Sequence, residues 1–208
     1  MQRAEAETYW NHNTAYHPWI LRVVGRRSRV LDVGCGDGLL MERLASVSDH
    51  VVGLEPDPAT AARARARLDG MPGVEIVESG FLDYRPESAL DAIVFVASLH
   101  HVGLADGIRR AVDLLAPGGV LVVVGLARNH SVTDWVRSAA SIPVNLVAGW
   151  LHSERQDVGV PIADPEETYA DLRRVVAEQL PGARWRYGLH YRYLLRWTAP
   201  PPHRPRLP

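Results

Sequence analysis

The sequence predicts a single α/β domain in which helices cover both faces of a parallel β-sheet. Short runs rich in valine, isoleucine and leucine recur along the chain, and segments with the apolar spacing of amphipathic helices lie between them. This alternation is typical of strands that helices bury on both faces. The length of 208 residues and the composition, 47% apolar and 23% charged, fit one globular domain with at most a small appendage.

Five strands alternate with helices in the first part of the chain. The expected strands are residues 30–33, 50–54, 74–77, 92–96 and 120–124. The expected helices between them are residues 39–47, 58–68 and 107–115. Asp57 caps the second of these helices and Pro58 takes its first position, while Pro117 and the two glycines after it turn the chain into the fifth strand.

Less regular segments flank this core. We expect an N-terminal helical cap over residues 1–28, with Pro18 at a first helical position, a main domain over residues 29–198, and an extended proline-rich tail over residues 199–208. The apolar segment 131–160 is either a substrate lid or a dimer surface. If it is a lid, Trp135 and Trp150 line an apolar pocket for the substrate.

The end of the main domain predicts one helix and two strands. Residues 166–180 form the helix, and residues 184–187 and 190–197 pair as a hairpin around Gly188. His190 and Arg192 could reach an acidic substrate from the last strand, although ordinary exposed strand charge is the default explanation.

Composition excludes several classes of protein. A single cysteine, Cys35, excludes a disulfide scaffold, and the net charge of −1 argues against non-specific binding of nucleic acid. All 23 basic residues are arginine, so a Schiff-base or phosphate-loop lysine is impossible. No apolar run reaches about 18 residues, and the charged N-terminus does not resemble a secretory signal, so we expect no membrane span and a cytoplasmic protein.

A glycine-rich turn after the first strand carries the main chemical signal. Residues 30–38 read Val-Leu-Asp-Val-Gly-Cys-Gly-Asp-Gly, with glycines at 34, 36 and 38. A dinucleotide site needs the spacing G-x-G-x-x-G, which this turn lacks, so an NAD(P) oxidoreductase is disfavoured. Asp32 is unfavourable beside a pyrophosphate and suits a ligand with an ammonium group, although Asp32 and Asp37 could also be structural caps of the turn.

Two further acids extend the predicted ligand. Glu55 follows Gly34 by 21 residues at the end of the second strand, where an acid can accept hydrogen bonds from both ribose hydroxyls. Asp83 follows the third strand and could accept from an exocyclic amine, with Leu82 covering an adenine face; Glu87 and Asp91 are alternatives. The ligand so described carries an ammonium, a ribose and an adenine.

On these residues the chain resembles the class I S-adenosylmethionine (SAM)-dependent methyltransferases. The resemblance covers about residues 30–126, and its blocks, in order, are residues 30–38, 51–57, 80–83, 90–101 and 114–121. It implies a Rossmann-like, seven-stranded, mostly parallel sheet with helices on both faces and an antiparallel last strand. It also implies SAM as the cofactor.

The resemblance also implies roles for individual residues. The turn from Gly34 through Cys35 and Gly36 would cradle the methionine part of SAM, with Asp32 near its amino group. The remaining expected cofactor contacts are Glu55 with Pro56 at the ribose, Leu82 with Asp83 at the adenine, Ala97 with Ser98 facing the sulfonium, and Tyr16 with His17 over the cofactor. Cys35 is expected to pack and not to act as a nucleophile.

The residues that would contact the methyl acceptor are less clearly indicated by the sequence. His100 and His101 follow the fourth strand, where either could act as a general base, with a slight preference for His100; alternatively, both only shape the loop. Because adjacent histidines after a strand point in different directions, we expect at most one of the two to face the site. No third ligand has a spacing that predicts a metal site.

The residues after the fourth strand favour a compact acceptor over a nucleic acid. Ala97-Ser-Leu-His100 replaces the Asn/Asp-Pro-Pro-Tyr/Phe tetrad of nucleic-acid adenine-N6 methyltransferases. We therefore expect O- or N-methylation of a small molecule, such as a secondary metabolite, by a monomer or homodimer. The alternative is a non-catalytic subunit or sensor that binds an adenosyl nucleotide.

Overall fold

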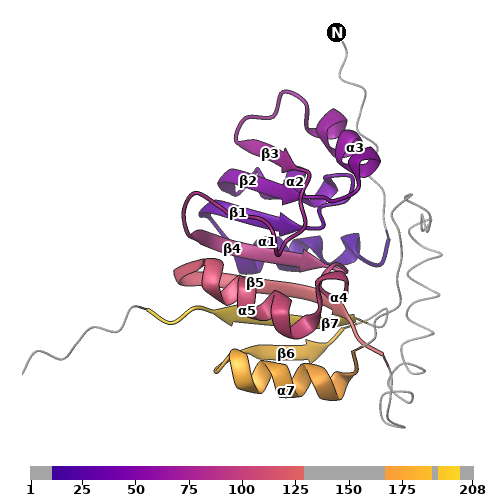
Figure 1. The fold of residues 1–208 in the computed structure, drawn as a ribbon. Coiled ribbons are helices and arrows are strands. Elements are labelled where there is room, and N and C mark those ends of the chain that lie inside the picture. Colours follow the sequence, from indigo (N-terminus) through magenta and orange to yellow (C-terminus); the bar gives the residue numbers. More distant parts are fainter. Residues whose placement is uncertain (1–10, 129–166, 189–191, 202–208) are drawn as a thin grey trace, which may run out of the picture.

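The chain forms a seven-stranded mixed sheet in the computed structural model, which describes residues 11–128, 167–188 and 192–201. Within these residues the strand order is β3-β2-β1-β4-β5-β7-β6 (Figure 1). The strands are β1 Arg27–Val33, β2 Ser48–Leu54, β3 Val74–Val77, β4 Leu90–Val96, β5 Leu115–Leu126, β6 Arg184–Tyr187 and β7 Arg192–Thr198. Strands β1 to β5 pair in parallel, whereas β7 runs antiparallel to both β5 and β6. The expected Rossmann-like sheet with an antiparallel last strand is therefore confirmed.

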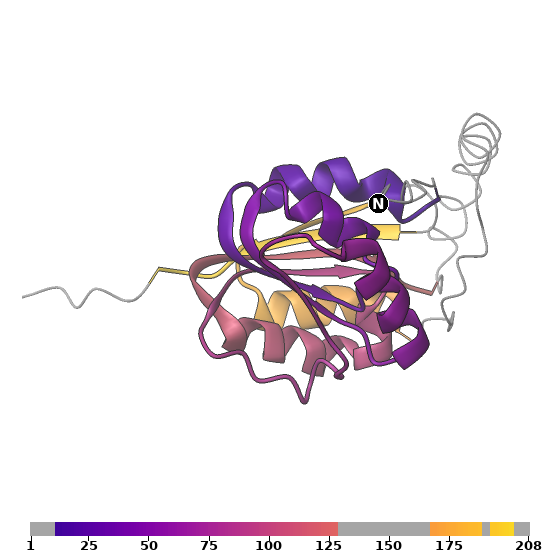
Figure 2. The same ribbon diagram turned by 90° about the horizontal axis from the view of Figure 1, so that it is seen from above.

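Helices lie on both faces of this sheet. They are the short η1 Thr14–Tyr16, then α1 His17–Val24, α2 Leu39–Leu44, α3 Pro58–Leu68, α4 Leu99–Val102, α5 Leu104–Leu114 and α7 Tyr169–Gln179. Seen from above, α1 lies over one face, and α5 and α7 lie under the other (Figure 2). Both faces are covered, so the central strands are apolar on both sides.

The core is two apolar layers separated by the sheet. Alternate residues of a strand point to opposite faces, so Val30 belongs to the same buried cluster as Ile20 of α1, whereas Leu31 belongs to the cluster that contains Ile108 of α5. All four of these side chains are fully buried. Complete burial of such a side chain contributes about 1.5–3 kcal/mol, so the two layers fix the position of the strand ends above them.

Helix starts follow the expected capping chemistry. Asp57 accepts a hydrogen bond from the Thr60 amide at 2.8 Å, and Pro58 opens α3. Helix α7 begins with a capping box, in which Thr168 and Asp171 each bind the backbone of the other.

Several boundaries differ from the expectation. Strand β1 begins at Arg27, inside the segment assigned to the N-terminal cap, and α2 ends at Leu44 because the chain then turns into β2. Pro117 and the glycines after it lie within β5, at a register shift opposite residues 90–92, so the expected tight turn is a bulge in a longer strand.

Helix α4 was not expected, and α5 begins three residues before the predicted helix. A four-residue helix is too short to show apolar periodicity, and Gly103 at φ +88° separates it from α5.

Some predictions lie outside the described residues. These are the lid or dimer segment 131–160 with its two tryptophans, His190, the tail from residue 202 and the first ten residues of the cap.

Candidate cofactor and acceptor site

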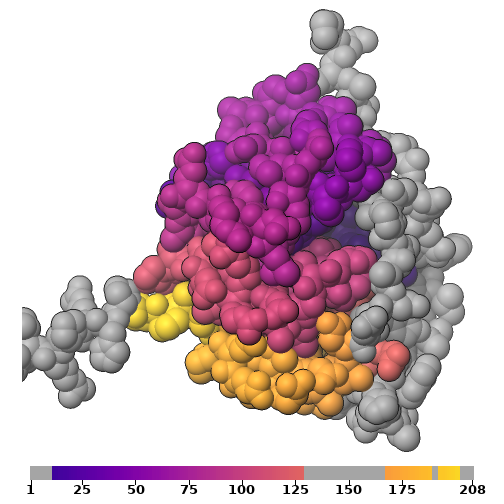
Figure 3. Space-filling view, viewed as in Figure 1, coloured from indigo at the N-terminus to yellow at the C-terminus, as the bar shows by residue number. Residues whose placement is uncertain are grey.

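A cavity of about 810 Å³ opens at the carboxyl ends of the parallel strands. In the space-filling view the surface is hollowed between purple residues and the pink residues below them (Figure 3). The strand order reverses between β1 and β4, and open α/β sheets bind their ligands at this point. We refer to this space as the main cavity.

The glycine turn after β1 forms one wall of the main cavity. The amides of Gly34 and Cys35 both donate to the carbonyl of Leu54, at 2.9 and 3.0 Å, which ties the turn to the end of β2. Gly34 has φ +70°, and a Cβ there would lie 2.7 Å from the Cβ of Ser98. No other residue fits this position without a shift, so the turn can follow the surface of a ligand closely.

Asp32 is a buried carboxylate at the base of this wall. Its side chain lines the main cavity, it is 2% exposed, and its Oδ2 atom has no hydrogen-bond partner within the described residues. Burial, and secondarily the charge of Glu55, raise its pKa to about 7. An ammonium group in the cavity would offset both effects, since a buried charge needs a partner. This geometry fits the amino group of SAM.

Glu55 follows β2 directly and lies in the same wall of the main cavity. Its Oε2 accepts from the Gly36 amide and its Oε1 from the Asp57 amide, both at 3.1 Å. Each carboxylate oxygen has a further lone pair, and Glu55 lines the main cavity together with Pro56. Glu55 therefore fixes the glycine turn and can also accept from ribose hydroxyls.

The segment after β3 forms the part of the main cavity where the adenine of the cofactor is expected. Leu82 is 42% exposed and Asp83 is exposed, and both line the main cavity. Phe81 anchors the segment from below, where its buried ring meets that of Phe95 edge-on at 5.2 Å. Asp91, the alternative to Asp83, instead accepts from the Arg29 amide at 2.9 Å and does not line the cavity.

The end of β4 supplies the opposite wall. Ala97 has φ +53°, a conformation that costs energy for a residue with a Cβ and that clusters at functional sites. Helix α4 then brings His100 and His101 into the lining, with ring centroids 4.1 Å apart. Sequence reasoning expected at most one of the two histidines to face the site.

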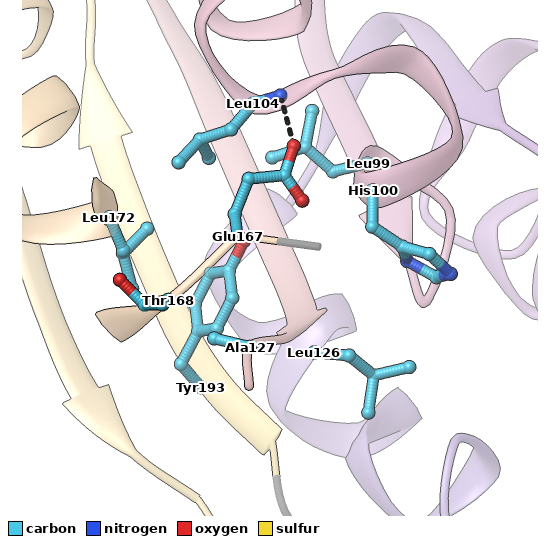
Figure 4. A pocket seen from close by; sticks show the side chains of 9 residues that line it. All are labelled: Leu99, His100, Leu104, Leu126, Ala127, Glu167, Thr168, Leu172 and Tyr193. Atoms are coloured by element: carbon cyan, nitrogen blue, oxygen red, sulfur yellow. Dashed lines mark hydrogen bonds between the residues drawn. The ribbon is translucent and has the colours of Figure 1, made fainter. Parts of the chain in front are cut away.

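His100 also lies at the edge of a second, much smaller cavity. Its volume of about 10 Å³ is close to the minimum for one water. The carboxylate of Glu167 lies there and accepts from the Leu104 amide at 3.1 Å (Figure 4). This bond ties the segment before α7 to the first turn of α5, next to the helix that carries the histidines.

The N-terminal segment covers the main cavity from the side of α1. His17 lines it and is buried, and its Nδ1 atom lies 3.0 Å from Nη1 of Arg43. Burial, with a smaller effect of Arg43, lowers the pKa of His17 to about 3, so the ring is neutral at pH 7. Tyr16 does not line the cavity; its hydroxyl lies where a Cβ on Gly188 would approach it to 2.7 Å.

Two of the predicted residues have structural contacts of their own. Burial raises the pKa of the Cys35 thiol, which keeps it protonated and fits the expected packing role. Asp37 pairs with Arg67 at 2.8 Å and accepts from the Leu39 amide at the start of α2, so the alternative of a structural cap holds for Asp37.

The structure adds lining residues that the sequence did not indicate. They are Asn11, His12, Asn13, Thr14, Ser79 and Phe81, among others. Ser98, which was expected beside Ala97, also lines the cavity. Arg192, considered for an acidic substrate, also lines the cavity, and its Nε and Nη2 atoms donate to Oδ1 of Asn13 at 3.1 and 2.8 Å. The N-terminal residues follow no motif or period, so only the fold could bring them here.

Comparison with known proteins finds methyltransferases. A sequence model of the methyltransferase domain matches residues 30–119. The Mycobacterium tuberculosis protein named uncharacterized methyltransferase Rv0089 is 35% identical over 201 residues, which are 92% of this chain and 98% of that protein. A ubiquinone biosynthesis O-methyltransferase of Methylobacterium sp. is 29% identical over 178 residues, 75% of this chain and 66% of that protein.

A solved structure supports the same fold. The N-methyltransferase NodS from Bradyrhizobium japonicum, in complex with S-adenosylhomocysteine (SAH), superimposes with a TM-score of 0.61 at 21% identity and covers 90% of this chain and 87% of that one.

The fold and the glycine turn with its two acids define a Rossmann-like enzyme that binds SAM. The chain belongs to the class I SAM-dependent methyltransferases, and SAM is its cofactor. None of the helices in residues 11–128, 167–188 and 192–201 has the length and apolar character needed to cross a bilayer.

Proposed function

We propose that this enzyme transfers the methyl group of SAM to an oxygen or nitrogen of a small-molecule acceptor by in-line displacement. The main support is that one continuous cavity contains both the buried carboxylate Asp32 and the two histidines at the end of β4. Its volume of about 810 Å³ lies within the usual range for ligand pockets, about 300–1,000 Å³. The names of the O-methyltransferase and N-methyltransferase relatives support either acceptor atom.

The residues over β1, β2 and β3 would hold the cofactor. Asp32 would bind its ammonium, Glu55 its ribose, and Leu82 and Asp83 its adenine face and amine. When bound, SAM supplies an electrophilic methyl group with a neutral thioether as the leaving group. The turn at Gly34 and the strained backbone at Ala97 would set the direction along which the acceptor approaches.

The histidines of α4 would serve the acceptor. Its nucleophilic atom must lie about 3–3.5 Å from the methyl group, in line with the bond to sulfur. His100 is half-buried and His101 is exposed, so His100 is better shielded from water. We assign to His100 the uptake of the acceptor's proton, which a hydroxyl or protonated amine must lose.

The test is transfer of label from SAM tritiated on its methyl group. The enzyme is incubated with the low-molecular-mass filtrate of a bacterial extract, and with the retained macromolecules in parallel. The proposal expects labelled small molecules, with a rate lowered about 100-fold in His100→Ala while SAH affinity stays unchanged. Label found only in macromolecules overturns the small-molecule acceptor. Tight SAH binding with no transfer in either fraction favours the non-catalytic binding subunit.

A further inference from the structure

Charge divides the walls of the main cavity by strand. Its described carboxylates all lie on or follow β1, β2 and β3; they are Asp32, Asp37, Glu55, Asp57 and Asp83. The lining histidines and arginine come from the N-terminal segment, α1, α4 and β7; they are His12, His17, His100, His101 and Arg192. Of these, His17 is neutral at pH 7, because burial lowers its pKa to about 3. Because β1 lies between β2 and β4, the acids occupy one side of the sheet's reversal point. The acidic side suits the cationic cofactor, so the basic side is left for the acceptor.

Among the described residues that line the main cavity, Arg192 is the one arginine, and its charge is permanent. It begins β7 and pairs with Leu126 of β5, which also lines the main cavity. Its guanidinium donates twice to Oδ1 of Asn13, a residue 179 positions earlier in the chain. The backbone N–H of Asn13 in turn donates to Oδ1 of Asn11 at 2.9 Å. These bonds hold the guanidinium in place, and a fixed guanidinium loses less side-chain freedom when it binds a ligand.

We propose that the acceptor carries an anionic group, a carboxylate or a phosphate, and that Arg192, oriented by Asn13, binds it. The planar fork of arginine matches two oxygens of either anion. In this arrangement Arg192 sets specificity by anchoring the acceptor and takes no part in the chemical step. The inference deepens the proposed function and rests on it, since it requires an acceptor over the β4–β5–β7 side.

The carboxylate of SAM itself is a competing partner for Arg192. The amino-acid end of the cofactor belongs near Asp32 on β1, and β7 lies three strands away in the sheet. With about 4.8 Å between neighbouring strands, this separation is about 14 Å. The distance favours the acceptor, and the experiment separates the two partners.

The experiment measures binding of anion probes to the SAH-loaded enzyme by calorimetry. The probes are benzoate, inorganic phosphate and benzamide, the last a neutral match for benzoate. We expect at least one anion to bind and benzamide not to bind. Arg192→Gln should weaken binding of that anion about tenfold or more, and Arg192→Lys should recover part of it. Arg196→Gln is the matched control, because Arg196 is exposed on the same strand and does not line the cavity.

Affinity for SAH, measured for every variant, separates the outcomes. Unchanged SAH affinity in Arg192→Gln shows that the variant is folded and that its loss concerns the acceptor side. The inference is overturned if no anion binds, if Arg192→Gln binds the anion as well as wild type does, or if its SAH affinity falls instead. Failure of the wild type to bind SAH overturns the proposed function as well. Binding of benzoate alone identifies a carboxylate, and binding of phosphate alone a phosphate.

Discussion

The ionised carboxylate of Asp32 is poorly stabilised when no ligand is bound. It is 2% exposed, and one of its oxygens lacks a partner within the described residues. Burial and the neighbouring Glu55 favour the protonated form, so the pKa is raised to about 7. The same carboxylate becomes favourable when an ammonium group enters the cavity. If Asp32 binds the ammonium of the cofactor as proposed, cofactor binding depends on pH.

This coupling can be tested with Asp32→Asn. The folded protein keeps the proton of Asp32 up to a pKa of about 7, whereas the ordinary value is 3.8. The resulting contribution to stability is full below pH 3.8 and is lost as the pH rises through 7. The free energy of unfolding of Asp32→Asn, relative to wild type, should therefore rise across this interval in chemical denaturation. A constant difference between the two proteins would assign the titration elsewhere.

Binding gives the complementary result for the same variant. Wild-type affinity for SAH should increase as the pH rises toward and above 7, because the ammonium needs the ionised carboxylate. Asp32→Asn should bind SAH about tenfold more weakly at pH 8, with little dependence on pH. Calorimetry over this pH range measures both effects.

Glu55 has two tasks, and its removal should affect both. Glu55→Ala deletes the acceptor for the Gly36 and Asp57 amides and the predicted ribose contact. We expect SAH affinity to fall at least about tenfold, which corresponds to about 1.4 kcal/mol. Glu78→Ala is the control, because Glu78 pairs with Arg65 at the surface and does not line the cavity. Equal SAH affinity in the two variants would remove the ribose assignment.

At the scale of elements, the turn between β1 and α2 depends on close contact with the end of β4. The Oγ atom of Ser98 donates to the carbonyl of Val33, and the Cα atom of Gly34 lies directly against the Ser98 side chain. The ends of β1 and β4 therefore determine the conformation of the glycine turn together. A substitution at the end of one strand should alter the position of the other.

Gly34→Ala tests this contact. A left-handed backbone costs a residue with a Cβ about 1–2 kcal/mol, and the new methyl group would also meet Ser98 at 2.7 Å. Gly70→Ala provides the matched comparison, because Gly70 has a similar φ of +72° and open space around it. Thermal denaturation should show a larger loss for Gly34→Ala, and SAH affinity should fall in that variant alone. Equal losses in both variants would mean that the contact with Ser98 has no energetic role.

At the scale of the whole molecule, the proposed cofactor site joins elements that are distant in the chain. Loops after β1, β2, β3 and β4 and the N-terminal segment all contribute to one cavity. A ligand that bridges them stabilises the folded state and not the unfolded chain. Cofactor binding should therefore raise the stability of the entire domain.

SAH at about 100 times its Kd should raise the free energy of unfolding by about 2.7 kcal/mol. NAD at the same concentration should have no such effect, because the glycine turn lacks the spacing that places a pyrophosphate on the helix. Thermal shift measurements with the two ligands provide the comparison. A stabilisation by NAD equal to that by SAH would contradict the assignment of the turn.

Local patterns were sufficient for most of the fold. The first five strands show as apolar runs, and the start of α3 shows as Asp57 followed by Pro58, because these signals depend on neighbouring residues alone. Helix α4 left no such signal, since four residues cannot display a helical period. The bulge in β5 was also hidden, because pairing with β4 and not the local sequence decides where a strand continues.

The sequence by itself determined the fold class and the cofactor, because the glycine turn, Asp32 and Glu55 lie at fixed distances along the chain from strands that are easily recognised. Only the tertiary structure decided the composition of the acceptor side. Arg192 and Asn13 meet across 179 residues, and both histidines of α4 line the same cavity. The physical reason is that strand ends gather residues by their order in the sheet, and hydrogen bonding between distant strands sets that order.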